Sequence, residues 1–234
     1  MGQPFISGKR EQLYQSASLR EVRLMLKEDH ILIEWDRAMT AVSSGLWGGG
    51  WHDGVRRIVN WRVPLDFACA DPIALMEQQL RAWGYGSEQV IGLQTAADLH
   101  AASVIEETGD CFRLLCCTTA GIGNAARAGR PRQTYSAYSC GTINTALMVK
   151  GRLTPAAMIN ALLTATEAKA VALQDLGIRD ENGEIASGTT TDSIALVVSQ
   201  QGYEETHQFA GTATSIGHAI ARSVYQSVVE AIGE

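Results

Sequence analysis

The segment CFRLLCCTT at 111–119 constrains the fold more than any other part of this sequence, because it is an unbroken and mostly apolar run. A strand with one face in water alternates apolar and polar residues, whereas a strand covered on both faces does not need to. We therefore expect this segment to lie in a sheet with other structure packed on both sides.

Shorter apolar segments predict the other strands of that sheet. The first of them are joined by short polar turns, which favours antiparallel pairing. The order of the strands does not follow from the sequence. We expect the further strands at 21–26, 30–36, 38–43, 55–63, 89–94, 102–107, 141–149 and 192–199.

Two long helices are predicted by the same starting signal. Asp71-Pro72 and Thr154-Pro155 each place a capping side chain before a proline, whose missing N–H has no partner in the first helical turn anyway. Glycines at 84 and 177 suit the ends of these helices. The second helix contains seven alanines, so we expect it to pack closely on the sheet. A third, amphipathic helix is predicted at 214–232.

These elements predict the α+β class, with one layered domain over residues 1–234 in which long helices cover a largely antiparallel or mixed sheet. A chain of 234 residues can bury its own core. The first 20 residues give no clear signal.

Charge and cysteine usage limit the partners. The net charge is −6, and the one basic cluster (Arg127, Arg130 and Arg132) is short and interrupted, so nucleic acid is not expected to bind. The five cysteines match no zinc spacing, and we expect them to be reduced and buried.

The start MGQPFISGKREQ is too polar for a signal peptide, and no apolar run approaches the roughly 20 residues of a membrane span. We therefore expect a cytoplasmic protein without a membrane partner, and a homo-oligomer remains open.

Five short segments of small and polar residues adjoin the predicted strands and helices. Their glycines let backbone amides approach a ligand, and their hydroxyls and carboxamides can bind its polar groups. Each segment taken alone also suits a plain turn. They are SSGLWGGG at 43–50, TTAGIGNAARAG at 118–129, SCGTIN at 139–144, SGTTTDS at 187–193 and AGTATSIG at 210–217.

Several common chemistries have no motif here. The glycines at 45–50 lack the Lys-Ser/Thr of a phosphate loop, and Gly121-Ile122-Gly123 lacks the third glycine of a dinucleotide site. There is no GxSxG or HExxH pattern, and no two of the five histidines are spaced i, i+4.

The set of segments resembles the adenosylcobinamide amidohydrolase family, in the family's order and over most of the chain from about residue 40. Asn60-Trp61-Arg62-Val63-Pro64 also sits where that family has an Asn followed by Val-Pro. The matching segments are IGLQTAAD at 91–98, TTAGIGNAARAG at 118–129, GTINTALMV at 141–149, TATEAKAVAL at 164–173, SGTTTDSIALV at 187–197 and AGTATSIG at 210–217.

The resemblance implies hydrolysis of the amide that joins the propionyl arm of the corrin ring to aminopropanol, giving adenosylcobyric acid. The corrinoid is then the substrate, and no cofactor is required. A flat, amide-fringed ligand suits a groove of hydrogen-bonding loops with aromatic faces. Trp47 and Trp51 could supply such faces, although ordinary core or rim packing is the slightly favoured interpretation.

Four residues of the matched segments are candidates for catalysis. Glu167 lies among alanines, where burial would raise the pKa of its carboxyl, unless it is a surface residue paired with Arg222 or Lys169. Asp192 could orient a water or a hydroxyl, or cap a turn. Asn124 could donate to the oxyanion, or occupy a left-handed turn. Thr191 is a candidate nucleophile.

Two routes to hydrolysis remain open from the sequence. Glu167 or Asp192 could activate water directly, which we favour because no histidine lies in a matched segment, or a Thr or Ser hydroxyl could attack first. Self-cleavage before a threonine is a further alternative. No metal site is predicted, although Asp98, His52 and His100 could serve as ligands. Expected contacts to substrate are Ser44, Trp47, Asn60, Asp98, Gly121, Gly123, Asn144, Thr189, Thr190 and Thr212.

Two other functions fit the same residues. The protein could be a corrinoid carrier that does not hydrolyse its ligand, or an amidase for a small amide that is not a corrinoid. Binding of cobinamide without release of aminopropanol would indicate the carrier. Hydrolysis of a simple amide without binding of any corrinoid would indicate the other amidase.

Overall fold

The computed structural model describes residues 2–67, 69–131 and 141–233. Arg132 of the basic cluster lies outside these ranges, as do Ser139 and Cys140 of one small-residue segment. The predictions made for these three residues are therefore not tested here.

One mixed sheet of nine strands forms the centre of the described chain. The path through the sheet is β1-β2-β3-β9-β8-β7-β6, and β4 pairs with both β3 and β5. The strands are β1 (Gln12–Gln15), β2 (Val22–Leu26), β3 (His30–Ser43), β4 (Gly50–Arg62), β5 (Val90–Thr95), β6 (Ser103–Thr108), β7 (Arg113–Ala120), β8 (Ile143–Lys150) and β9 (Ser193–Val198).

The long strand β3 joins the two halves of this sheet. Its first part pairs with β2 and β4, and its last residues, Thr40 to Ser43, also pair with β9. The pairs from β1 to β4 are antiparallel, as the short turns predicted, whereas β4–β5 and β8–β9 are parallel. Because of this shared strand the sheet curls, and its two halves face each other.

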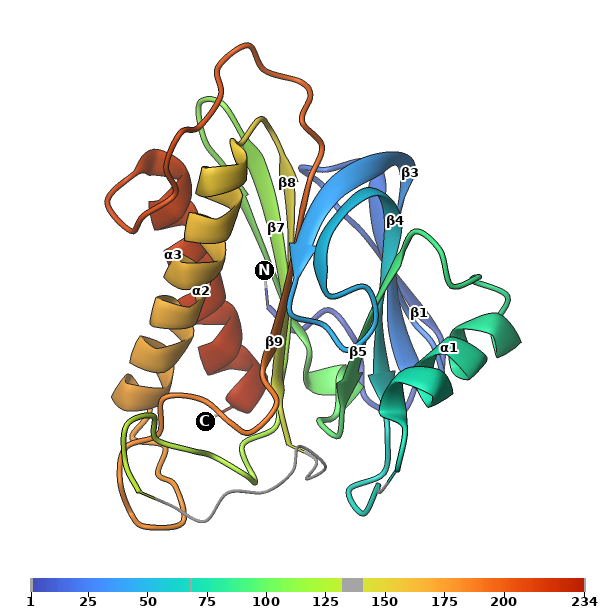
Figure 1. The fold of residues 1–234 in the computed structure, drawn as a ribbon, viewed down its shortest axis with the longest axis vertical. Helices are drawn as coiled ribbons and strands as arrows, with labels where there is room; N and C mark the ends of the chain where they lie inside the picture. The colour runs from blue at the N-terminus through green and yellow to red at the C-terminus, as the bar shows by residue number, and fades with distance from the viewer. Residues whose placement is uncertain (1, 68, 132–140, 234) are drawn as a thin grey trace.

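Helices cover both outer faces of the curled sheet (Figure 1). The long helices α2 (Pro155–Asp175) and α3 (Ser215–Ile232) lie beside β7, β8 and β9, while α1 (Pro72–Ala82) lies on the far side against β4 and β5. A short 3₁₀ turn, η1 (Leu99–Ala101), follows β5. The α+β class with a helix-covered mixed sheet is therefore confirmed.

The predicted helix starts are confirmed in atomic detail. The Asp71 carboxylate accepts a hydrogen bond from Ala74 N at 2.9 Å, and Thr154 Oγ1 accepts one from Ala157 N at 3.1 Å. Gly84 and Gly177 follow their helices with φ of +74° and +66°, a left-handed conformation that side chains disfavour.

The apolar segment at 111–119 has both faces covered, as predicted. In β7, Leu114 and Cys116 belong to the core between the sheet and helices α2 and α3. Leu115 and Cys117 belong to the second core, between the two halves of the sheet. A third, smaller core lies under α1 around Met76 and Leu80.

Three strand predictions were wrong in extent. The segments 30–36 and 38–43 form the single strand β3, whose pairing with β4 is irregular between Glu34 and Met39. The strand predicted at 55–63 begins earlier, at Gly50, because the end of β3 supplies hydrogen bonds to the glycine-rich stretch. Strand β1 was not predicted. Its residues alternate between half-buried and exposed positions, so the strand has no fully buried face and its sequence shows no clear apolar pattern.

The prediction that no segment is long and apolar enough to span a membrane needs correcting for one helix. By length and composition, α2 alone among the described helices could cross a membrane, although the sequence analysis found no such apolar stretch. Half of that stretch is buried within the protein. Its buried face packs in the core shared with α3 and the sheet, which accounts for its apolar composition.

Candidate active site

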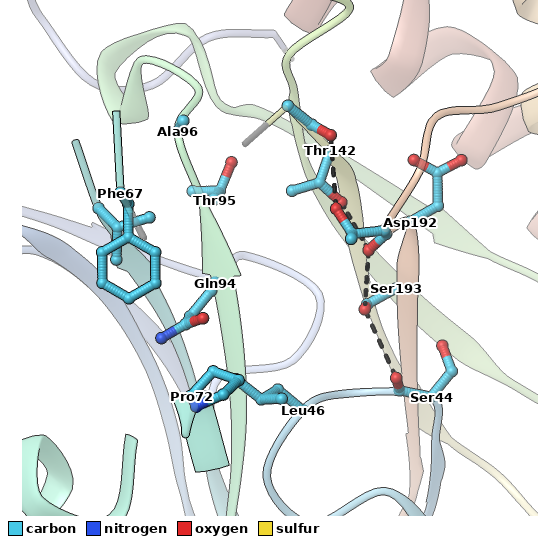
Figure 2. Close-up of a pocket in the computed structure, with 13 residues that line it drawn as sticks. Ser44, Leu46, Phe67, Pro72, Gln94, Thr95, Ala96, Thr142, Asp192 and Ser193 are labelled. Atoms are coloured by element: carbon cyan, nitrogen blue, oxygen red, sulfur yellow. Dashed lines mark hydrogen bonds between the residues drawn. The ribbon is translucent and has the colours of Figure 1, made fainter. Parts of the chain in front are cut away.

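A cavity of about 400 Å³ lies at the edge where the two halves of the sheet meet. It is bounded by the residues that follow β3, β4 and β5 and by those that precede β8 and β9. Figure 2 shows one wall made by Phe67, Gln94 and Thr95, and a facing wall made by Thr142, Ser193 and Ser44. The described residues that line it are Ser44, Leu46, Val63, Phe67, Pro72, Gln94, Thr95, Ala96, Gly141, Thr142, Thr191, Asp192 and Ser193.

The loop after β3 is held against two other strands, and this fixes Ser44. Ser44 N donates to Ile194 O at 3.0 Å, and Ser44 Oγ accepts from Ile194 N at 3.0 Å. Trp47 then exchanges two backbone hydrogen bonds with Gly92 of β5. Gly48 permits this close approach, because a Cβ there would lie 2.7 Å from Val90 O. The glycine-rich segment is therefore a rigid part of the cavity wall.

Asp192 is the most heavily hydrogen-bonded side chain at the cavity. Its Oδ1 accepts from Ile143 N at 2.9 Å and from Thr189 Oγ1. Its Oδ2 accepts from Thr189 N at 3.0 Å and forms an ion pair with Lys169 Nζ. Of the roles predicted for Asp192, capping the turn and orienting a hydroxyl agree with these bonds to Thr189. Orienting a water is not supported, because four donors already use the carboxylate oxygens. Asp192 instead holds the starts of β8 and β9 in place.

Lys169 is the buried partner of Asp192 and projects from α2. The side chains of Lys169 and Asp192 are 9% and 12% exposed. A buried ion pair is favourable only when the remaining hydrogen-bonding positions are also satisfied, and the Asp192 carboxylate accepts three further hydrogen bonds. Gly188 makes room for the pair, since a Cβ there would lie 2.6 Å from Asp192 Oδ2 and 3.0 Å from Lys169 Nζ.

Hydroxyl groups line the wall next to this ion pair (Figure 2). Thr142 Oγ1 donates to Thr191 O at 2.8 Å, and Ser193 Oγ lies 3.5 Å from Ser44 O. Thr191 Oγ1 makes a long contact of 3.4 Å with Gly141 O. Within the described chain, Ser44 Oγ accepts a hydrogen bond and donates none, so its proton is available to a ligand in the cavity.

A buried chain of side-chain amides lies beneath Gln94. Asn144 Nδ2 donates to Asn60 Oδ1 and to Gln94 O, both at 2.8 Å, and Asn60 Nδ2 donates to Thr119 Oγ1 at 2.8 Å. The predicted site residues Asn60 and Asn144 are therefore together, but they support the cavity from below and do not line it.

Glu167 was expected to be buried, and that prediction is wrong. The side chain is exposed on the outer face of α2, where its Oε2 accepts from Thr212 Oγ1 at 3.2 Å. Neither Glu167 nor Thr212 lines the cavity. The two proposed partners of Glu167 are also engaged elsewhere, Lys169 with Asp192 and Arg222 with Glu107.

The other predicted residues divide between the cavity and its surroundings. Ser44, Thr191 and Asp192 line it. Several lie just behind its walls: Gly121 N donates to Thr142 O, Asn124 lies against Gly141, and Thr189 binds Asp192. Thr190 is half-buried next to them, and Gly123 is exposed. Asp98 caps η1, and Trp47 lines a separate cavity of about 490 Å³ with His52.

The residues named as possible metal ligands are not brought together. Asp98 and His100 contact each other, while His52 binds Gly49 O beside the second cavity. In the part of the chain that the structure describes, no three His, Cys, Asp or Glu side chains are placed to share a metal ion.

The cysteines are free thiols in the described chain, at 69, 111, 116 and 117. Cys116 and Cys117 are buried as predicted, whereas Cys69 and Cys111 are half-buried. Burial raises the pKa of the Cys116 thiol to about 11, so this thiol is held in its unreactive, protonated form.

Three residues of the site were missed by the sequence analysis. Lys169 lay in the quoted segment TATEAKAVAL, where a charged residue at helical spacing from the alanines was the available signal. Gln94 lay in IGLQTAAD and Thr142 in GTINTALMV. No local signal separates these two from their neighbours, because their importance comes from segments distant in the sequence.

The fold and the cavity define a layered α+β protein whose cavity offers hydroxyl and carboxamide groups within a largely apolar lining, a suitable setting for chemistry on an amide. Comparison with known proteins identifies the class as an amide-bond hydrolase. The family model for adenosylcobinamide amidohydrolase matches residues 12–234, and the chain belongs to this family. The resemblance seen in the sequence is thereby confirmed.

Two relatives show the extent of this similarity. The chain is 31% identical over 210 residues to the adenosylcobinamide amidohydrolase of Methanosarcina mazei, covering 87% of this chain and 94% of that protein. It is 34% identical over 174 residues to an uncharacterised protein of Methanocaldococcus jannaschii, covering 66% of this chain and 67% of the other.

Solved structures give weaker matches. A Burkholderia beta-aminopeptidase aligns with a TM-score of 0.46 and 13% identity, over 87% of this chain and 77% of that one. A protein of Pyrococcus horikoshii OT3 aligns with a TM-score of 0.44 and 11% identity, over 99% of this chain and 82% of the other.

Proposed function

We propose that this protein hydrolyses the amide between the corrin propionyl arm and aminopropanol in adenosylcobinamide, releasing adenosylcobyric acid and aminopropanol. Water supplies a hydroxyl group to the carbonyl carbon and a proton to the leaving nitrogen. The observation that carries the proposal is the position of the cavity, because segments matching the family converge there. The corrinoid is the substrate, no separate cofactor is invoked, and we place this salvage reaction in the cytoplasm.

The size of the cavity suggests how such a substrate is held. Drug-sized ligands occupy pockets of roughly 300–1,000 Å³, and this one is about 400 Å³. A corrinoid is larger than a drug, so we propose that only the arm with the scissile amide enters. The macrocycle then remains outside, over the apolar rim of Leu46, Phe67 and Pro72.

Within the cavity, Ser44 is the hydroxyl that we propose attacks the amide carbonyl. Its Oγ is fixed by Ile194 N, and its proton is not given to any described protein acceptor. The Ser44 Oγ–C bond forms as the C–N bond breaks, and the hydroxyl proton passes to the leaving nitrogen, so aminopropanol departs as a neutral amine. Water then hydrolyses the ester, giving the carboxylic acid and restoring the Ser44 hydroxyl, so that water is the net source of both groups. This route replaces direct water activation by Glu167 or Asp192, because Glu167 lies outside the cavity and the Asp192 carboxylate already accepts four donors.

The test is incubation of the purified protein with adenosylcobinamide in water enriched in ¹⁸O, followed by mass spectrometry. We expect adenosylcobyric acid carrying one labelled oxygen, together with free aminopropanol. Binding without release of aminopropanol would make the protein a carrier and refute the proposal. Cleavage of a simple amide together with no corrinoid turnover would also refute it. A surface variant, Gln174→Leu, serves as the matched control and should retain full turnover.

A further inference from the structure

The side-chain amide of Gln94 presents its oxygen to the cavity. In Figure 2, Oε1 points toward the wall that carries Ser44 and Ser193, whereas Nε2 points away from that wall. Nε2 is buried in the protein, so the oxygen is the end of this amide that a ligand can reach. Within the described chain no side-chain or backbone group donates a hydrogen bond to Oε1. The cavity therefore contains an acceptor that can bind a donor brought by a ligand.

Buried hydrogen bonds anchor the backbone of Gln94 to two other strands. Gln94 lies in β5, and its backbone oxygen accepts from Asn144 Nδ2 of β8 at 2.8 Å. Asn144 Nδ2 also donates to Asn60 Oδ1 of β4 at 2.8 Å. Asn60 and Asn144 are 6% and 2% exposed, and buried networks whose members are satisfied make their surroundings rigid. The acceptor is therefore carried on a rigid support.

The polarity of the lining limits which donor Oε1 can bind. In the described lining Asp192 is the one charged side chain, and Lys169 already pairs with it. A carboxamide oxygen accepts hydrogen bonds and donates none, so it selects an N–H or O–H group of the ligand. Along the arm proposed to enter the cavity, such donors are the N–H of the scissile amide and the terminal hydroxyl of aminopropanol. Both belong to the leaving group of the reaction.

We infer that Gln94 Oε1 accepts a hydrogen bond from the aminopropanol portion of the substrate, through its N–H or its hydroxyl, and so determines specificity for the leaving group. This inference rests on the proposed function and deepens it. The Ser44 hydroxyl acts on the carbonyl carbon from the facing wall, while Gln94 orients the amine side of the same bond. An arm without the contacting donor would leave Oε1 unpaired on binding and should be a poorer substrate.

A variant of similar shape removes the acceptor. Gln94→Met should lower kcat/KM for adenosylcobinamide about five- to tenfold, the range expected for one neutral hydrogen bond. Its thermal midpoint should stay equal or rise, because the change also removes a buried N–H that has no acceptor in the described chain. Gln174→Met, on the exposed face of α2, is the matched control and should change neither quantity.

Substrate analogues identify the donor. One analogue is the ester in which an oxygen replaces the amide nitrogen, and the other is the propylamide that lacks the hydroxyl. For each compound the measured quantity is kcat/KM of the wild-type protein divided by kcat/KM of Gln94→Met. A ratio near one for the ester alone assigns the contact to the N–H, and a ratio near one for the propylamide alone assigns it to the hydroxyl. Either result supports the inference.

The remaining outcomes overturn the inference or the proposed function separately. Equal ratios for adenosylcobinamide and both analogues would mean that Oε1 contacts neither donor, and equal losses with a lower thermal midpoint would give Gln94 a structural role only. If the wild-type protein releases no aminopropanol, the proposed function fails. Affinities for the same three compounds, followed by the visible absorbance of the corrin, then replace kcat/KM. A loss of affinity in Gln94→Met that one analogue escapes would still support the contact, and unchanged affinities would overturn it.

Discussion

Removal of Lys169 should reveal how much the buried ion pair stabilises the fold. Lys169→Met keeps most of the side-chain length but leaves the Asp192 carboxylate buried without its counter-charge. Breaking a buried pair from one side costs about 3–5 kcal/mol, because the remaining charge loses its partner in a poorly solvated place. The three hydrogen bonds that Asp192 retains, from Ile143 and Thr189, place the expected loss near the lower end, about 3 kcal/mol.

The assay is equilibrium unfolding in urea, followed by tryptophan fluorescence, for a double-mutant cycle. Lys169→Met, Asp192→Asn and the double variant are compared with the wild-type protein. The double variant should cost about 2 kcal/mol less than the sum of the singles, because it leaves no isolated charge. The control is Arg81→Met, which removes an exposed i, i+4 pair with Glu77 and should cost only about 0.3–0.5 kcal/mol.

The reasoning would be refuted by a small effect at Lys169. If Lys169→Met lowers the free energy of unfolding by less than about 1 kcal/mol, the pair behaves as an exposed one. Strict additivity in the cycle would likewise mean that Lys169 and Asp192 do not interact.

Three further predictions concern the site and the core. Ser44→Ala should abolish aminopropanol release while corrinoid binding persists, whereas Ser193→Ala should retain most turnover; a fully active Ser44→Ala protein would exclude the serine as nucleophile. Gly188→Ala should lower both stability and turnover, since the new Cβ displaces the ion pair, and an unchanged melting temperature would contradict the packing described here. Burial lowers the pKa of His30, although Asp29 partly opposes this. The unfolded chain therefore takes up a proton more readily, so stability should be full above about pH 6.5 and fall as the pH decreases below it. His30→Gln should flatten this part of the stability profile, and the exposed His218→Asn should not.

The helices and most strands could be predicted because their signals are local. A capping side chain followed by proline, a glycine in the left-handed region and an unbroken apolar run each depend on a few neighbouring residues. The irregular part of β3 and the early start of β4 could not be predicted, since both depend on pairing between strands. The parallel partners of β5 and β9 likewise depend on tertiary contacts.

The site was predicted by segment more successfully than by residue. The alanine-rich surround in α2 correctly indicated a buried ionisable side chain, but the chosen residue was wrong. Glu167 and Lys169 are two positions apart, and at 3.6 residues per turn they point to nearly opposite sides of the helix. The alanines at 161, 165, 168 and 172 are buried, and Lys169 follows 165 by one turn on that face. Grouping the residues by helical face, and not by adjacency in the sequence, would have identified Lys169.

The cavity should form late in folding, because its walls come from strands that are far apart in the sequence. Ser44 and Ile194, which are 150 positions apart, must already be hydrogen-bonded for the hydroxyl wall to exist. Closing such long loops is slow compared with forming helices or hairpins. A nascent or truncated chain that lacks β9 would therefore possess Gln94 and Ser44 but no enclosed space between them. Catalytic turnover in this protein therefore requires β9 to have joined the sheet, and loss of β9 should abolish turnover.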